Sequence, residues 1–375
     1  MKEFAFDSIP FSEIVRLGQI SQLYRDLFCT SWILGRFCNY KCSYCWPYAS
    51  TKTRDHRPFS QIVSTMQSIK SQARERGFNS FHFSFSGGEP TAHPNYLDVL
   101  EHYSSDTKSL YQSVHMTSNL SPGLKWFERY AHATRSLHRV SITASFHKEF
   151  ADRIAFAEKL LFLQEQNIQI TINMVMVPTR FDVLWQDALY FHEQGLNVTL
   201  KPQSNENATK VVDGYTPEQL LTLKRGLPQM DFTTNRIQRK GIPNLRPKSP
   251  LHIDSEPSAE QKIRQIMQLE MVDRRGRKWY LDQAERLNAF EFNNFKGWIC
   301  SAGYRSIIIR EPGGVVKRSY SCHDQPLGSI DSGFQLFDQL KPCVTPSCVS
   351  SADSKIPKRR AESSLPLWPE GVPPT

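Results

Sequence analysis

The sequence lacks a long hydrophobic run. None of its apolar stretches approaches the roughly 20 residues that a membrane-spanning helix requires. The N-terminus also lacks the basic start, long apolar stretch and small-residue cleavage site of a secretory signal. These absences argue against a membrane-spanning or secreted protein, so we expect a cytoplasmic protein without a membrane partner. The 375 residues, 39% of them hydrophobic, suffice for one large or two modest domains.

Cysteine is missing from residues 46 to 299, a gap of 254 residues. The eight cysteines therefore fall into two groups, one on each side of the gap. In a secreted chain this number would suggest disulfides. Two separate groups in a chain without a secretory signal instead suit two metal sites.

The first group is a tight cluster of thiols. Cys38, Cys42 and Cys45 follow the apolar run SWILG with the spacing C-x3-C-x2-C. Structural zinc sites need four ligands, and their cysteines usually come in matched pairs. A cubane iron-sulfur cluster takes one thiolate per iron, so three cysteines leave one iron open to another ligand. The alternatives are a zinc site that borrows Cys29 or His56, and three incidental cysteines.

A glycine-rich turn follows the next expected strand. Residues 80–86 read as an apolar and aromatic strand that ends at Gly87-Gly88-Glu89-Pro90. Two glycines allow the backbone to approach a ligand closely. Taken alone, the turn is an ordinary strand-to-helix connection. Its position after the cysteine motif makes it a candidate part of the same site.

With these two motifs, the sequence resembles the radical S-adenosylmethionine (radical SAM) superfamily. The resemblance implies that the open iron chelates SAM, that an electron from the cluster cleaves the sulfonium, and that the 5'-deoxyadenosyl radical abstracts hydrogen from a substrate. An external one-electron donor such as flavodoxin or ferredoxin would supply the electron. The implied residues are Cys38, Cys42 and Cys45 for the [4Fe-4S] cluster, Tyr44 against the adenine, and Gly87, Gly88, Glu89 and Pro90 for the SAM amino group.

Strands and helices are expected to alternate after the cysteine motif. Helical periodicity and strand-like runs bounded by turn residues predict an α/β fold with parallel βαβ units. The simplest architecture is a partial (β/α)6 TIM-type barrel with its site at the carboxyl ends of the strands. After the first strand, the expected strands are 80–86, 112–119, 139–147, 169–178 and 197–203, and the expected helices are 59–77, 94–103, 123–133, 149–166 and 181–194.

Polar residues near these strand ends are further candidates. The resemblance implies that Ser145 and Asn173 contact the SAM carboxylate or ribose, and Ser118 ends the strand before them. The alternative for each is a hydrogen bond to neighbouring backbone. His147 stands where the family often has an acidic residue, two positions after the serine. It is the candidate catalytic residue, as a substrate contact or a proton donor.

The excess of positive charge is uneven. Net charge is +9, and residues 224–248 hold seven lysines and arginines against one acid, Asp231. A second run, DRRGRKW, covers residues 273–279. Such runs can neutralise phosphates, so we expect an anionic or nucleic-acid substrate; the alternative is a solvated loop. Helices are expected at 216–226 and 258–272.

The second group supplies a complete ligand set. Cys300, Cys322, Cys343 and Cys348 could close a zinc site or a fully ligated [4Fe-4S] cluster. The cysteines bracket an expected hairpin around residues 312–314, which resembles the SPASM or shorter twitch auxiliary-cluster domain of radical SAM enzymes. Seven residues separate Gly314 from Cys322, where the family pattern has about four. This cluster would accept or relay electrons; the alternative is a purely structural cluster.

The expected organisation has five parts: an N-terminal extension (1–29), the barrel (30–204), a basic bridging segment (205–297), the auxiliary cluster domain (298–350) and a flexible tail (351–375). The expected function is C–H activation of an anionic substrate such as a nucleotide, nucleic acid or phosphorylated metabolite. The first alternative is peptide or protein modification, although only 37 residues precede Cys38, too few for a leader-peptide recognition domain. The second is a non-catalytic zinc or iron-sulfur nucleic-acid-binding protein.

Overall fold

The computed structural model describes residues 8–19, 27–46, 51–206, 210–228, 268–282, 284 and 286–367. Within these ranges the chain forms one ten-stranded and one six-stranded sheet. The fold class is mixed α/β, as the sequence predicts. None of the helices in these ranges is long and apolar enough to cross a membrane.

Six neighbouring strands of the larger sheet are parallel and follow one another in chain order, with β7 at the edge of the sheet. Along most of these strands, buried side chains alternate with half-buried ones. This is the period-2 pattern of a sheet with two different faces. The strands are β2 (Leu27–Gly35), β3 (Ser80–Gly87), β4 (Tyr111–Ser118), β5 (Arg139–Phe146), β6 (Gln169–Met176) and β7 (Asn197–Pro202).

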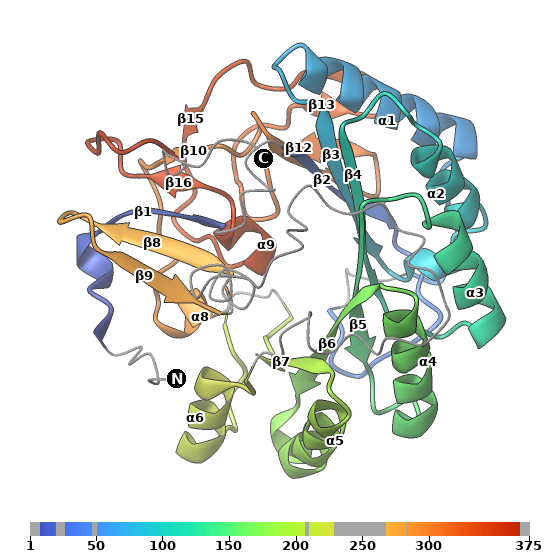
Figure 1. Ribbon diagram of the computed structural model, residues 1–375. Helices are drawn as coiled ribbons and strands as arrows, with labels where there is room; N and C mark the ends of the chain where they lie inside the picture. The colour runs from blue at the N-terminus through green and yellow to red at the C-terminus, as the bar shows by residue number, and fades with distance from the viewer. Residues whose placement is uncertain are drawn as a thin grey trace, which may run out of the picture.

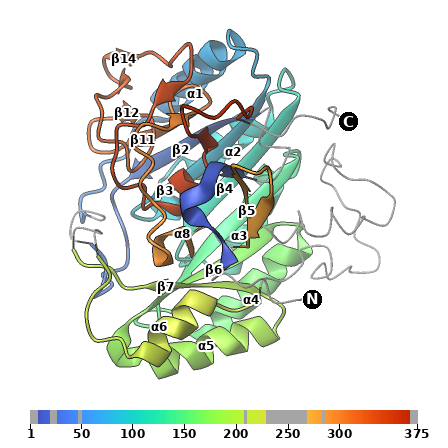
Figure 2. The same ribbon diagram turned by 90° about the vertical axis from the view of Figure 1, so that its left-hand side faces the viewer.

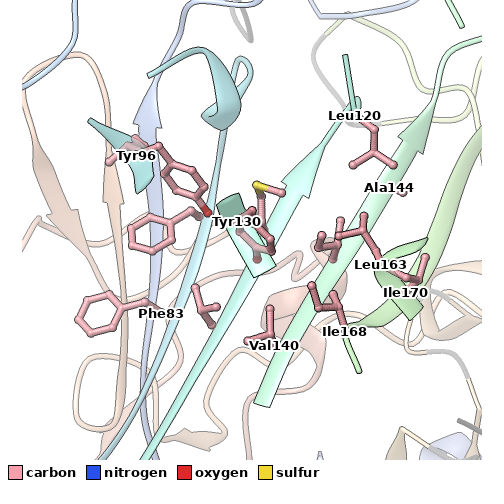
Figure 3. Packing of buried hydrophobic residues seen from close by; sticks show 14 of the residues in the cluster. Phe83, Tyr96, Leu120, Tyr130, Val140, Ala144, Leu163, Ile168 and Ile170 are labelled. Carbon is pink, nitrogen blue, oxygen red and sulfur yellow. The ribbon is translucent and has the colours of Figure 1, made fainter. Parts of the chain in front are cut away.

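Five helices alternate with these strands and cover one face of the sheet (Figure 1). Aromatic and aliphatic side chains fill the layer between helices and strands, among them Phe83, Tyr96 and Tyr130 (Figure 3). One expected helix, 149–166, begins only at Arg153, because the Asp152 carboxylate accepts from the first backbone N–H groups, those of Ile154 and Ala155. The helices are α1 (Phe59–Arg74), α2 (Tyr96–Ser104), α3 (Leu124–Ala133), α4 (Arg153–Glu165) and α5 (Phe181–Glu193).

The C-terminal hairpin extends this same sheet. Strand β11 (Ser306–Arg310) pairs in parallel with β2, and β12 (Val315–Lys317) returns antiparallel to it. The short strands β13 (Gly328–Ser329) and β14 (Gly333–Phe334) continue the sheet outward. Ile307 and Ile309 join the main hydrophobic core. The hairpin expected within an auxiliary domain therefore adds to the parallel sheet, because its apolar face completes the core beside β2.

The six-stranded sheet unites both ends of the chain. It is antiparallel, with a separate hydrophobic core that includes Cys300, Cys343 and Cys348. Figures 1 and 2 show it on the side of the molecule away from helices α1 to α5. Its strands, in spatial order, are β15 (Lys341–Pro342), β10 (Ile299–Cys300), β16 (Lys358–Arg359), β1 (Ile14–Gln19), β8 (Leu269–Asp273) and β9 (Lys278–Leu281).

Three sequence expectations fail in this sheet. The end of the helix expected at 258–272 is strand β8, and the rest of that range lies outside the described residues. The N-terminal extension contains β1 and the start of β2, so the parallel sheet begins before residue 30. The expected flexible tail contains regular structure within residues 351–367, where α9 (Ser351–Ser354) precedes β16, and β16 pairs with β1 and β10. The short strands β8 and β16 gain hydrogen bonds from partners that are distant in sequence.

The structure describes one of the two basic runs fully and the other only in part. DRRGRKW is the β8–β9 turn, in which the Asp273 carboxylate accepts from the backbone N–H groups of Arg275 and Arg277. Lys224 and Arg225 end helix α6 (Pro217–Arg225), whose expected start is confirmed by a capping box between Thr216 and Gln219. Residues 229–248, which hold most of the first run, lie outside the described residues. The remaining short elements are η2 (Phe11–Glu13), η4 (Pro90–Ala92), η5 (Pro178–Arg180) and α8 (Arg286–Ala289).

Candidate active site

The three cysteines of the first group lie on one loop after β2. The Cys45 N–H donates to the Cys42 carbonyl at 3.1 Å, so the end of the loop is a tight turn. Burial, followed by the nearby Cys45 and Cys38, raises the pKa of Cys42 to about 12. Neighbouring thiolates repel one another, and cationic iron removes that repulsion. By its donor chemistry, the loop fits a cluster with three thiolate ligands.

Cys29 cannot be the fourth ligand of this loop. It lies near the start of β2, in register with His82 and Ser306, whereas the loop follows the far end of the strand. The strand from residue 29 to residue 35 spans about 20 Å at ~3.3 Å per residue. His56 packs against the ring of His93 instead, with centroids 4.7 Å apart. Among the residues described, no three His, Cys, Asp or Glu side chains form a group suited to a single metal ion.

The glycine turn lies against the base of the cysteine loop. Gly88 N–H donates to the Gly35 carbonyl at 2.9 Å, and Glu89 N–H donates to the Phe37 carbonyl at 2.7 Å. A Cβ atom would lie 2.2 Å from the Gly35 oxygen at position 87 and 2.1 Å from the Phe37 oxygen at position 88. Both positions therefore require glycine. The structure brings the two motifs together, and Pro90 begins the short helix η4 directly after them.

The buried Glu89 carboxylate connects the ends of β3 and β4 by hydrogen bonds. It accepts from the Ser118 hydroxyl and the Asn119 N–H, each at 2.7 Å, and from the N–H and hydroxyl of Thr91 at 3.0 and 2.7 Å. Burial raises the pKa of Glu89, and these hydrogen bonds oppose the rise. Ser118 is itself buried and also accepts from Leu120 N–H. In this structure, Glu89 and Ser118 therefore hold the ends of β3 and β4 together beside the cysteine loop.

His147 contacts the cysteine loop. Its Nδ1 atom lies 2.8 Å from the Tyr44 hydroxyl and 3.2 Å from the Cys42 sulfur. The Tyr44 and His147 rings stack with centroids 5.9 Å apart. Burial lowers the pKa of His147 to about 4, so the imidazole is neutral near pH 7. The two expected candidates are therefore neighbours at the end of β5.

Two further contacts of the loop were not expected from the sequence. Glu149 accepts from the Ser43 N–H at 2.8 Å and pairs with Arg180 at 3.1 Å. The Asn119 amide donates to the Asn39 side chain at 3.0 Å and lies 3.9 Å from the Cys38 sulfur. These contacts of the loop join residues that are 80 to 106 positions apart in sequence, and no local motif marks the partners. Only the strand-end position of Asn119 offers a signal.

Ser145 and Asn173 lie side by side in register on β5 and β6. Both are half-buried and alternate with fully buried residues that pack toward the helices. They therefore belong to the face of the sheet opposite the helices, which we call the open face. It carries polar side chains from four neighbouring strands: Ser84, Ser86, His115, Thr117, Thr143, Ser145, Thr171 and Asn173.

A hydrogen-bonded ladder crosses the open face. His115 Nδ1 lies 2.9 Å from the Ser84 hydroxyl, and its Nε2 lies 2.8 Å from the Thr143 hydroxyl. Burial, with the nearby charges of Lys355, Arg139 and Lys201, lowers the pKa of His115 to about 3. A neutral imidazole donates to one hydroxyl and accepts from the other. The ladder can therefore offer a ligand the proton of one hydroxyl and the remaining lone pairs of both hydroxyls.

The second cysteine group gathers three segments of the chain. All four cysteines are buried, and Cys300 interacts electrostatically with each of Cys322, Cys343 and Cys348. Backbone bonds fix two of them: Cys343 N–H donates to Trp298 and Cys348 N–H to Asn293. Burial raises the pKa of Cys322 to about 11. A cubane has one thiolate on each of four irons, so the donor set fits such a cluster.

Residues 32–182 match the family profile described as the Radical SAM superfamily. This segment is a radical SAM domain. The match includes the cysteine loop, the glycine turn, His147 and the strand-end residues up to Asn173. The protein is an enzyme that uses SAM, and the family that this segment matches implies a [4Fe-4S] cluster and an electron donor. This rules out the expected alternative of a non-catalytic nucleic-acid-binding protein.

Solved structures resemble the fold at low identity. Native anSMEcpe with bound AdoMet and Kp18Cys peptide is 13% identical over 81% of this chain and 77% of that chain, with a TM-score of 0.49. Streptococcus suis SuiB bound to precursor peptide SuiA is 14% identical over 78% of this chain and 59% of that chain, with a TM-score of 0.43. Likeness of this extent does not carry a substrate over to the radical SAM domain. No curated protein matches the chain.

Proposed function

We propose that the protein activates a C–H bond of a substrate carrying an anionic group, such as a nucleotide or phosphorylated metabolite. When bound, the cluster and SAM supply the 5'-deoxyadenosyl radical. Cys38, Cys42 and Cys45 would hold the cluster, and Gly87 to Pro90 would shape the site of the SAM amino group. The parallel strands would form a partial (β/α)6 barrel around the open face. A flavodoxin or ferredoxin would donate the electron.

The observation that carries the anionic substrate is the charge beside the open face. Lys201 on β7 is half-buried, and its positive charge contributes to the lowered pKa of His115. Within the described ranges, its ammonium group forms no hydrogen bond or ion pair with the protein. Lys355 and Arg139 add positive charge near the same histidine. Glu89, at the end of β3, and Asp353, which contacts Tyr320 and Ser321, already accept several hydrogen bonds.

A second cluster is part of the proposal. Cys300, Cys322, Cys343 and Cys348 would hold a SPASM- or twitch-type auxiliary [4Fe-4S] cluster. Four buried thiols beside the extended parallel sheet support this assignment. Such a cluster can take up the electron left on a substrate radical, which zinc cannot do.

Peptide modification remains the alternative substrate class. The matched structures of anSMEcpe and SuiB contain bound peptides. Their TM-scores are too low for those substrates to carry over. The positive charge of Lys201 beside the open face favours an anion instead.

Lys201 tests the substrate class. We expect uridine 5'-monophosphate to bind the SAM-loaded protein more tightly than uridine, because a phosphate can pair with the ammonium group. Lys201→Met should weaken binding of the monophosphate roughly tenfold, the value of one charge-assisted hydrogen bond. Equilibrium dialysis measures both ligands, with Lys125→Met on the outer helix α3 as the matched loss of charge. Equal binding of both ligands to all three proteins would favour peptides or neutral metabolites.

A further inference from the structure

The C-terminal segment that follows the second cysteine group is packed into that group. Strand β16 pairs with β10, with Lys358 opposite Cys300. Ser301 N–H and its hydroxyl both donate to the Pro357 carbonyl at 3.2 Å. The same strand also pairs with β1. Residues 357–359 are thus an internal part of the sheet that carries Cys300.

Asp353 fixes the chain that leads to Cys322. Its carboxylate accepts from Ser321 N–H at 2.6 Å and from Tyr320 N–H at 3.2 Å. The Tyr320 hydroxyl in turn lies 3.2 Å from the hydroxyl of Ser86, directly before the glycine turn. Asp353 is 2% exposed. It therefore sets the position of Cys322 relative to the main sheet.

Lys358 is a buried cation whose positive charge is only partly balanced by its hydrogen-bond acceptors. It is 1% exposed, and its ammonium group donates to the carbonyls of Asp353 and Ser354 at 2.8 and 3.3 Å. Its Nζ atom also lies 4.7 Å from the centroid of the Phe295 ring. No carboxylate in the described part of the chain forms an ion pair with it. A buried ammonium is costly unless a negative charge lies nearby.

The Asp353 carboxylate interacts electrostatically with this ammonium group, and the cysteines would add further negative charge once they are ligated. Lys358 lies opposite Cys300 in the β10–β16 pair, and both residues are buried. The charge of Lys358 also interacts with Cys343 and Cys348. Four thiolates exceed the positive charge of a cubane core, so a ligated centre is a net anion. A second buried cation, Arg318, also interacts with Cys300 and Cys322, but it is paired with Asp324 at 2.9 Å.

We propose that Lys358 is the built-in countercharge of the second iron-sulfur centre and raises its reduction potential, with Asp353 opposing it. This inference rests on the proposed auxiliary cluster. Reduction adds one electron to the centre, and a nearby positive charge stabilises the reduced, more negative form. A positioning role alone would require the strand but not the charge.

The test measures the midpoint potential in full-length protein carrying Cys38→Ala, Cys42→Ala and Cys45→Ala, so that only the second centre responds. The protein is reconstituted with iron and sulfide, titrated with dithionite, and followed by electron paramagnetic resonance. Lys358→Met should shift the potential to more negative values. Asp353→Asn, which removes a nearby negative charge, should shift it to more positive values. Lys296→Met, an exposed loss of charge in the same region, should leave it unchanged.

The outcomes separate the two levels of the proposal. If the parent protein binds zinc, or lacks about four irons per chain, the auxiliary cluster itself is wrong. If iron is present but neither Lys358→Met nor Asp353→Asn shifts the potential, the countercharge is wrong and the cluster stands. Should Lys358→Met fail to fold, the sign of the shift in Asp353→Asn still decides, since a negative or absent shift contradicts the charge effect.

Discussion

At the scale of single residues, the glycine turn explains why two distant motifs act together. Gly88 has room for hydrogen only, because the Phe37 carbonyl occupies the place of a side chain. The sequence predicted a close backbone approach at this turn. It did not predict that the backbone approached belongs to the cysteine loop, since that contact depends on the pairing of β2 with β3.

Gly88→Ala should therefore displace the cysteine loop. The added methyl group forces the backbone apart, at a cost of about 1–3 kcal/mol in the free energy of unfolding. We expect weaker SAM binding and loss of iron from the first centre, measured by equilibrium dialysis and iron analysis. Gly123→Ala is the matched control, because a Cβ there meets nothing within 4 Å and φ is −73°. Equal iron content and SAM affinity in both variants would show that the turn tolerates a side chain.

At the scale of elements, the alternating strands and helices were predictable and the antiparallel strands were not. The helical face of α1 and the alternation in β3 are local patterns that a short window of sequence reveals. Strand β16 has two residues and pairs with β1, some 340 positions earlier, at Arg16↔Arg359. Strand β8 belongs to the same sheet, and its five buried residues show no alternation. Such strands are defined by their partners, which local sequence does not specify.

The ion pair between Lys70 on α1 and Asp106 after α2 predicts that the stability of the protein depends on pH. Lys70 donates to Asp106 at 2.7 Å. Burial alone would raise the pKa of Asp106, but the hydrogen bond from Lys70 and further contacts lower it to about 2. A depressed pKa gives stability that is present above the unfolded value near 3.9 and is lost as pH falls toward 2.

Asp106→Asn should remove this dependence. Between pH 5 and pH 3, the wild-type protein should lose about 1 kcal/mol more of its unfolding free energy than the variant loses. Urea unfolding of the iron-free protein at the two pH values measures the difference. Asp98→Asn, at an exposed site on α2, should behave as wild type. An equal loss in wild type and Asp106→Asn would contradict the assigned role of the Lys70 pair.

At the scale of the whole molecule, the second cysteine group is joined to the main sheet from both sides. Strand β11 continues the parallel sheet at β2, and β16 links the tail to β1. The sequence predicted both cysteine groups and the residues of the first site. It missed this joining, because the hairpin pattern does not reveal which sheet edge it completes. The arrangement places Tyr320 in contact with the open face at Ser86.

The central claim is that the loop of Cys38, Cys42 and Cys45 cleaves SAM. The direct measurement is formation of 5'-deoxyadenosine from SAM under anaerobic conditions with dithionite, in reconstituted wild type and in the triple alanine variant. Wild type and the control Cys29→Ala should form 5'-deoxyadenosine. The triple variant should form none and should contain about four fewer irons per chain, the content of one cubane. Undiminished 5'-deoxyadenosine formation by the triple variant would contradict the assignment of the site.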